Sequence, residues 1–229
     1  MHRRFASVPA RLAVIALAIA ACAPAEAPSA HPTPSAAAVS VAPSGPKAWP
    51  TTFDVELSGW YEISPPFRIP LELTVQEAGW YSGHVHDTFT DLQRFDGQTP
   101  HQFPNRMLGF GDLDHVRGGD GDVDVAGLTP EAALDLLASR ASLKTSNRTT
   151  QALLGIDGAR MDIHSATNSN PLFGNGTDNF GLGPQLDIRL VLLPRDGRLL
   201  AVCVLAAPGD LDGAWKQALP ILETVKLGP

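Results

Sequence analysis

The chain has 229 residues, with 17 Lys and Arg against 24 Asp and Glu, and its formal net charge is −7 at pH 7. A negative chain of this kind disfavours nucleic acids and anionic lipid surfaces as partners, because both would repel it. Only two cysteines are present, Cys22 and Cys203. If Cys22 carries a lipid, as we predict below, no disulfide forms within the chain.

The first 22 residues predict export and a lipid anchor. Three arginines surround the start of an apolar run from Leu12 to Ile19, and Ile-Ala-Ala-Cys ends at Cys22. Basic, apolar and small residues in this order are typical of a secretory signal peptide. A Cys directly after the cut is the acceptor for a diacylglyceryl thioether, so the motif reads as a bacterial lipobox. We expect a signal peptide over residues 1–21 and a lipidated Cys22.

Two alternatives to the lipid anchor are a cleaved signal without a lipid and an uncleaved membrane anchor. The apolar run is about half of the ~20 residues that a spanning helix needs, which weakens the second. With the signal removed, the charge of the mature chain is 14 − 24 = −10. The expected location is extracytoplasmic, on the cell membrane or the outer membrane, with the lipid as the membrane contact.

Residues 22–50 are predicted to form the lipidated Cys and a disordered tether, because Ala, Pro and Ser dominate them. A single α+β domain is then expected over residues 51–229. Within it, residues 52–57 and 69–75 alternate apolar and polar side chains, as half-buried strands do. Residues 82–126 are rich in Gly, Asp and His and predict a loop-rich insertion.

Two helices are predicted in the second half of the chain. Thr129 as N-cap and Pro130 at the first helical position predict a helix near residues 130–140. A second helix is expected over residues 211–222, with Asp210 or Asp212 as its cap and a bend or early end at Pro220.

Four further strands and a hairpin complete the expected fold. The predicted strands cover residues 149–154, 159–164, 186–193 and 199–206. Asp196-Gly197 between the last two marks a hairpin turn. Cys203 lies in a continuous apolar run, where a cysteine is a small buried hydrophobe. Antiparallel strands with two helices predict an α+β fold, with a central antiparallel sheet flanked by helices.

His84 and His86 are the candidate metal ligands. At positions i and i+2 of a strand they would point the same way, and His101 or His115 would supply a third zinc ligand. The alternative is a solvated loop in which these histidines are merely polar.

A second candidate metal site is a calcium loop with Asp120, Asp122, Asp124 and Glu131 at positions one, three, five and twelve. Position six is Val125, where that loop needs Gly, so a flexible acidic loop is the alternative.

A ligand groove is the third candidate site. Trp60, Tyr61 and Trp80 would line it, and a long loop over residues 167–184 would border it. If these aromatic residues are core instead, the site belongs in the insertion over residues 82–126. The sequence contains no nucleophile elbow, Walker loop or dinucleotide fingerprint, so no cofactor is predicted.

The C-terminal half resembles a known family. The carrying segments are TPEAALDLL at 129–137 and the stretches 154–163, 189–200 and 214–225. In this order they are similar to exported bacterial lipoproteins with a Mog1/PsbP-like domain. The resemblance implies an antiparallel sheet packed between helices and an accessory role without catalysis. It transfers no catalytic residue, and it leaves residues 82–126 unmatched.

These observations predict a non-catalytic binding or accessory module, tethered to a membrane, whose partner is an unknown envelope protein or a small ligand. Two alternatives remain open. One is a metal-dependent hydrolase that uses His84 and His86, and the other is a structural factor in envelope assembly.

Overall fold

The computed structural model describes residues 45–97, 104–167, 170–175 and 178–228. The predicted signal peptide, the lipobox with Cys22, most of the tether and His101 lie outside these residues. The described residues belong to the unit formed by residues 42–229. Within them, no helix is long and apolar enough to cross a membrane.

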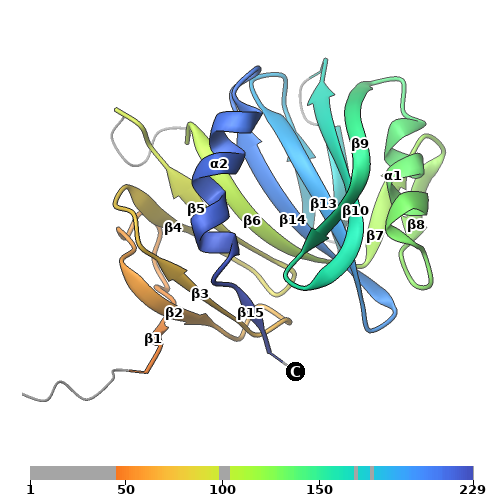
Figure 1. Cartoon of the computed structure of the whole chain (residues 1–229). Coiled ribbons are helices and arrows are strands. Elements are labelled where there is room, and N and C mark those ends of the chain that lie inside the picture. Colours follow the sequence, from red (N-terminus) through yellow and green to blue (C-terminus); the bar gives the residue numbers. More distant parts are fainter. Residues whose placement is uncertain (1–44, 98–103, 168–169, 176–177, 229) are drawn as a thin grey trace, which may run out of the picture. The chain divides into compact units, whose positions relative to one another are not determined.

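The main sheet of the described residues has seven antiparallel strands in the order β4-β5-β6-β14-β13-β10-β9 (Figure 1). Their bounds are β4 Trp80–Val85, β5 Phe89–Arg94, β6 Arg106–Leu113, β14 Arg198–Ala206, β13 Asp187–Arg195, β10 Ile156–Ser165 and β9 Leu143–Leu153.

Two smaller sheets of four strands each are found in the same part of the chain. The first small sheet contains β1 (Lys47–Ala48), β2 (Gly59–Ile63), β3 (Leu71–Val75) and β15 (Lys226–Leu227). The second small sheet contains β12 (Asp178–Leu182), β11 (Asn170–Asn175), β7 (His115–Gly118) and β8 (Gly121–Asp124). β1 runs parallel to β2, whereas β2 and β3 are antiparallel.

Strands β13 and β14 are buried on both faces of the main sheet. Along β14, Val202 and Val204 pack into one hydrophobic cluster, while Ala201 and Cys203 pack into another. Side chains alternate between the faces of a strand, so a strand covered on both faces needs apolar residues at every position. This explains the unbroken apolar run of β14.

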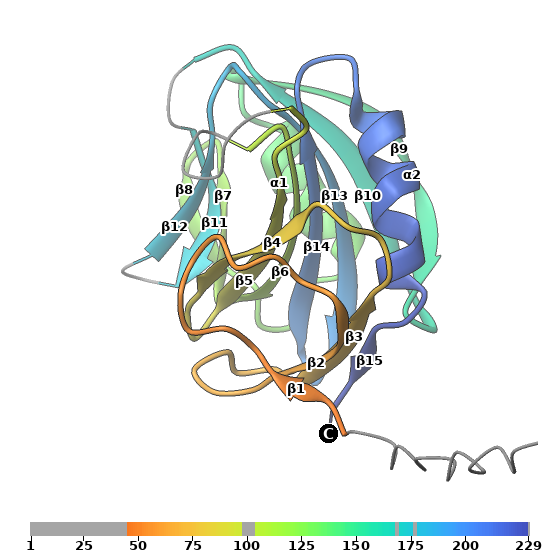
Figure 2. The same ribbon diagram turned by 90° about the vertical axis from the view of Figure 1, so that its left-hand side faces the viewer.

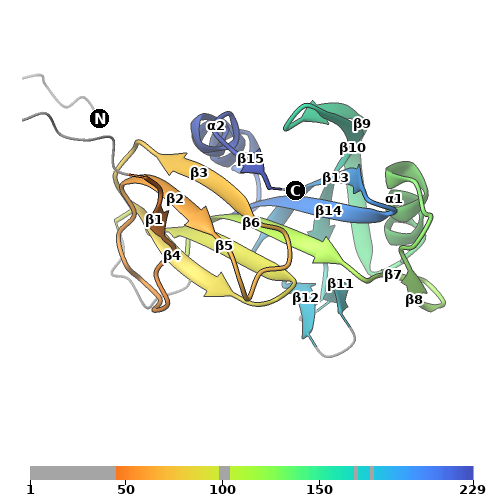
Figure 3. The ribbon, with the colours of Figure 1, turned by 90° about the horizontal axis from the view of Figure 1, so that it is seen from below.

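Each face of the main sheet is covered by one helix and one small sheet. Helix α2 (Leu211–Leu222) and the first small sheet contribute to one cluster. Helix α1 (Pro130–Ala138) and the second small sheet contribute to the other. Figures 2 and 3 show α2 and the β11–β12 hairpin on opposite sides of β13 and β14.

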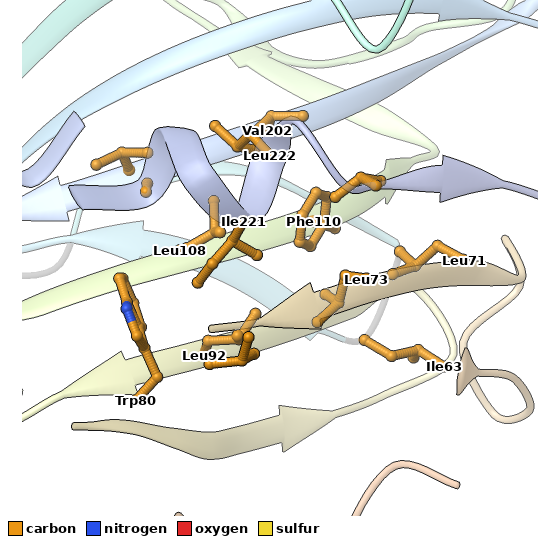
Figure 4. Close-up of a cluster of buried hydrophobic side chains, with 14 of the residues drawn as sticks. Ile63, Leu71, Leu73, Trp80, Leu92, Leu108, Phe110, Val202, Ile221 and Leu222 are labelled. Atoms are coloured by element: carbon orange, nitrogen blue, oxygen red, sulfur yellow. The ribbon is translucent and has the colours of Figure 1, made fainter. Parts of the chain in front are cut away.

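The cluster beneath α2 is a continuous apolar core. Ile221 and Leu222 of the helix meet Leu108 and Phe110 of β6, and Trp80 enters from β4 (Figure 4). All five side chains are at most 2% exposed. Burial of large apolar side chains here supplies the main driving force that holds α2 on the sheet.

The fold is richer in sheet than the expected α+β arrangement. It is mostly β-sheet with two helices and resembles a sandwich, because small sheets cover the faces together with the helices. One segment that we predicted to be a loop, residues 167–184, contains strands β11 and β12 instead. Residues 82–126, which we expected to be loop-rich, contain β4 to β8 in whole or part. Their Gly, Asp and Asn residues have low strand propensity, and pairing with neighbours overrides it.

Both predicted helices are confirmed, with one difference in capping. The Thr129 hydroxyl accepts a hydrogen bond from the Ala132 amide at 3.2 Å, as an N-cap does. Asp210 stands at the N-cap position of α2 but makes no capping bond. Its carboxylate instead accepts hydrogen bonds from Arg106. Helix α2 continues past Pro220 to Leu222.

The structure differs from two expectations near the start of the domain, one about a strand and one about where the folded part begins. Residues 52–57 form no strand, because Asp54 has φ +60° and turns the chain. The folded part also begins before residue 51, since β1 pairs with β2 and Trp49 is only 9% exposed. Trp49, near the end of the predicted tether, supplies enough apolar surface for this end to join the core.

The predicted hairpin turn and the predicted burial of Cys203 are consistent with the structure. Asp196 and Gly197 have φ of +50° and +76°, as a tight hairpin between β13 and β14 requires. Cys203 is fully buried in β14, next to Leu190 of β13. Gly59 and Gly79, which open the two Gly-Trp-Tyr triplets, both have positive φ, a conformation that favours glycine.

Candidate functional site

A pocket of about 650 Å³ lies on the face of the main sheet that also carries the second small sheet. Three neighbouring strands form its floor, where Gln93 of β5, Met107 of β6 and Leu205 of β14 stand side by side. The β11–β12 hairpin forms one wall with Phe173 and Phe180. The pocket therefore lies over the part of the main sheet that extends beyond α1 and the second small sheet on this face.

Glycines of β6 make room for the pocket's aromatic floor. A Cβ atom at Gly109 would lie 2.6 Å from Cζ of Phe89, and one at Gly111 would lie 3.5 Å from Cδ2 of the same ring. The Phe89 ring therefore lies against the bare backbone of the neighbouring strand. A side chain at position 109 would displace this ring.

Three phenylalanines form a continuous aromatic surface on this side of the pocket. The ring centroids of Phe173 and Phe180 are 4.9 Å apart and nearly parallel, at 6°. Phe89 approaches Phe180 with a centroid distance of 5.0 Å. Leu186 and Leu205 extend the apolar lining. An aromatic surface of this kind binds flat or flexible apolar groups.

The opposite end of the pocket is polar and is organised by Asp91. Its side chain is fully buried, and its carboxylate accepts hydrogen bonds from the His84 amide at 2.8 Å and the Gln93 side chain at 2.9 Å. The His84 ring places Nδ1 3.4 Å from the same carboxylate. Gly83 is required beside it, since a Cβ there would lie 2.0 Å from Oδ2 of Asp91.

A β-bulge between Ser82 and Val85 gives β4 this geometry, because an extra residue re-aims the side chains that follow. His84 stacks on His86 with ring centroids 5.9 Å apart, and Phe53 packs against His84 at 4.7 Å. The contact with Asp91 raises the pKa of His84, and burial opposes this only in part.

The remaining charged groups of the lining are paired with groups around the pocket. Arg106 donates to Asp210 at 2.6 Å and also contacts Asp96. Asp112 accepts a hydrogen bond from Arg198 at 3.1 Å. Burial raises the pKa of Asp112, and the guanidinium groups of Arg198 and Arg68 offset only part of this effect.

The structure separates the aromatic residues of the predicted groove. Tyr61 and Trp80 are 6% and 1% exposed and belong to the core beneath α2. Trp60 alone is exposed, at 38%, and donates a hydrogen bond to Glu72 at 3.2 Å. Adjacent residues of a strand point to opposite faces, so Trp60 and Tyr61 cannot line one groove. The predicted alternative was a site within residues 82–126, which supply only part of the pocket lining, because the rest comes from residues 173–205.

His84 and His86 lie side by side, as the spacing predicted, and both line the pocket. His115 stands on β7, where its Nε2 is 3.3 Å from the Asn179 side chain, and it is not among the lining residues. In the described segments, no group of three or more His, Cys, Asp or Glu is arranged to hold a metal ion.

The predicted calcium ligands are engaged elsewhere. Asp122 binds Arg117 with two contacts of 2.6 Å across the β7–β8 hairpin. Asp124 caps the Ala126 amide at 2.7 Å. Asp120 lies at the hairpin turn, and Val125, at the sixth position of the expected loop, is buried in the core. The segment therefore forms a hairpin rather than a cation-binding loop.

Most of the pocket residues were not expected from the sequence, among them Phe89, Asp91 and Gln93. A local signal was present, because Asp91 and Gln93 stand on either side of Leu92 and would share one polar face of a strand. Their proximity to Phe180, which lies far along the chain, has no local signal.

No family model and no curated protein matches the sequence. The fold is similar to several solved structures. Cyanobacterial PsbP from Synechocystis has a TM-score of 0.40 and 10% identity, over 75% of this chain and 94% of that one. The yeast Ran-binding protein Mog1p, from Saccharomyces cerevisiae, has a TM-score of 0.41 and 10% identity, over 75% and 96%.

LpqN, involved in cell envelope biogenesis of Mycobacterium tuberculosis, has a TM-score of 0.28 and 12% identity, over 77% and 82%. A protein of Bacteroides thetaiotaomicron has a TM-score of 0.40 and 10% identity, and this chain spans about half of its length, 49%. Scores below 0.5 are too low to assign a family, a ligand or a partner to this chain.

Proposed function

We propose that this protein is a non-catalytic binding module that holds a small, largely apolar ligand in the pocket over β5, β6 and β14. The observation that carries the proposal is the pocket itself. Its volume of about 650 Å³ lies within the range of ~300–1,000 Å³ typical of small-molecule sites. Phenylalanine, leucine and methionine side chains supply its apolar lining, and polar side chains share the lining with them.

The polar groups support binding rather than reaction chemistry. Asp91 is enclosed by its hydrogen-bond donors, and Arg106 and Asp112 are held by ion partners. Each of these groups is engaged with its own partners in the protein. An active site instead directs several polar groups at one reacting atom.

The proposed location is the outer side of a membrane, with Cys22 as the lipid anchor. The lipobox and the Ala-, Pro- and Ser-rich segment that follows it support this location. A Cys22→Ser variant should be released from membranes or accumulate as an uncleaved precursor in cell fractionation. A variant that is still processed to the same size and still sediments with membranes would contradict the anchor.

Ligand binding is testable with Nile red, an uncharged dye whose fluorescence rises in apolar surroundings. We expect saturable binding to the full-length protein, weakened about tenfold in a Phe180→Ala variant. Loss of one aromatic contact of this size costs about 1–2 kcal/mol. Trp60→Ala is the matched control, because Trp60 is exposed on the first small sheet and does not line the pocket.

A second variant protects this test against misfolding. Asn179 is exposed on β12 and lines the pocket, so Asn179→Trp should narrow the entrance without disturbing the core. Dye binding that is equal in wild type, Phe180→Ala and Asn179→Trp would show that the dye binds elsewhere, and the proposed function would be lost.

A further inference from the structure

The charges of the pocket are compensated within the protein. Asp91 accepts hydrogen bonds from the His84 amide and the Gln93 side chain, and the His84 ring places Nδ1 3.4 Å from Oδ1. Arg106 has Asp210 at 2.6 Å, and Asp112 has Arg198 at 3.1 Å. These three charged groups are therefore each held by other groups of the protein.

A charged ligand head would have to displace a group of the protein to reach Asp91, Arg106 or Asp112. The Asp91 side chain is fully buried beneath its donors, so an ammonium group cannot reach it without displacing His84. The Arg106 guanidinium contacts Asp210, Gln217 and Asp96 through Nε and both terminal nitrogens. A ligand carboxylate would therefore compete with Asp210 and Asp96. Transfer of an ion into an apolar pocket without a partner is strongly unfavourable.

An uncharged polar group, by contrast, has partners at one end. The imidazoles of His84 and His86 offer ring nitrogens that donate or accept according to tautomer, and both rings line the pocket. The far wall offers mainly apolar contacts from the rings of Phe173 and Phe180, and the side chain of Asn179 on this wall contacts His115. The two ends of the pocket therefore match the two ends of a neutral amphiphile.

We infer that the pocket selects an uncharged amphiphile, with its apolar body on the Phe89–Phe180–Phe173 surface and a neutral hydrogen-bonding end, such as a hydroxyl, at His84 and His86. This inference rests on the proposed function and adds the chemical class of the ligand. His84 acts here as a specificity residue, because its amide and its ring cover the Asp91 carboxylate.

The test compares three ligands of one chain length, 1-decanol, decanoate and decylammonium, as competitors of Nile red on the full-length protein below their aggregation concentrations. We expect decanol to displace the dye at a concentration at least tenfold lower than either ion. Equal or stronger displacement by decanoate or decylammonium would overturn the inference. The inference would also be overturned if the dye binds through Phe180 but none of the three ligands displaces it. In that case the proposed function would survive.

A pair of variants tests the role of His84 in this selectivity. His84→Ala removes the ring that covers the Asp91 carboxylate, so decylammonium should gain severalfold relative to decanol. Trp60→Ala is the control, because Trp60 is exposed on the first small sheet and does not line the pocket, and the ranking should stay as in wild type. If His84→Ala leaves the ranking unchanged while dye still binds, the covering of Asp91 by the His84 ring does not set the selectivity.

Discussion

The two halves of the main sheet differ in how their second face is used. Strands β13 and β14 are covered on both faces, and their side chains are almost all apolar and buried. Strands β5 and β6 are covered by α2 and the first small sheet on one face only, as Leu92 and Leu108 show. On their other face, Asp91, Gly109 and Gly111 border the pocket region.

This difference shows how one sheet supplies both stability and a site. Where both faces are covered, almost every residue is apolar, and the strand contributes mainly packing. Where one face is left open, glycine and polar residues are tolerated, and that face can bind a ligand. The same comparison suggests five experiments, from the largest expected effect to the smallest.

Cys203 probes the covered half. It is fully buried, and burial raises the pKa of its thiol, so the reactive thiolate is suppressed. Labelling by a thiol reagent under native conditions should be at least about a thousandfold slower than in denaturant, because it requires unfolding of the central strands. Mass spectrometry of the Cys22→Ser variant isolates this single thiol. Rapid native labelling would contradict the placement of β14.

The stability of the covered half, which contains β13 and β14, depends in part on one buried ion pair. Arg189 binds Asp162 through two contacts of 2.8 Å, and both side chains are less than 10% exposed. Arg189→Met should cost about 3–5 kcal/mol of unfolding free energy at neutral pH, because it leaves a buried carboxylate unpaired. Arg148→Met, which removes an exposed pair with Asp135, should cost at most about 1 kcal/mol.

The same pair carries a pH signature. Burial alone would raise the pKa of Asp162, but hydrogen bonds from Arg189 and Asn147 outweigh it, and the pKa is lowered. A lowered carboxyl pKa stabilises the fold above the unfolded value of about 3.9, and this is lost as the pH falls. The difference between wild type and Arg189→Met should therefore shrink below about pH 4 in urea denaturation. A constant difference would exclude the ion pair as its cause.

A direct comparison of the two halves uses one residue from each. Leu190→Ala in β13 should cost about 2–5 kcal/mol, because Leu190 is fully buried between covered faces. Gln93→Ala on the pocket floor should cost about 1 kcal/mol, since it removes one hydrogen bond to Asp91. Equal losses in urea denaturation would mean that the pocket floor is as tightly packed as the core.

The smallest effect concerns His84. The hydrogen bond to Asp91 raises the pKa of His84 above 6.5. Its contribution to stability is therefore fully present below about pH 6.5 and is lost as the pH rises through the folded-state pKa. About half of the side chain is exposed, so solvent screening should keep the contribution below about 1 kcal/mol. His84→Gln should remove this decline, and a decline that persists would assign it to another group.

The sequence by itself determined the elements whose signals are local. The Thr129 cap and its Pro130 predicted α1, and the Asp196-Gly197 turn between apolar runs predicted the β13–β14 hairpin and the burial of Cys203. These predictions succeeded because caps, turns and continuous apolar runs depend on residues close together in the chain.

The tertiary structure decided the rest. Strands β4 to β8 and the β11–β12 hairpin contain residues of low strand propensity, and pairing with neighbours makes them strands. The tertiary structure also decided that Trp80 belongs to the core while Asp91 borders a pocket. The difference depends on which face of the sheet is covered. Phe89 and Phe180 meet only after the chain has folded, and no local pattern encodes a contact between residues so far apart in sequence.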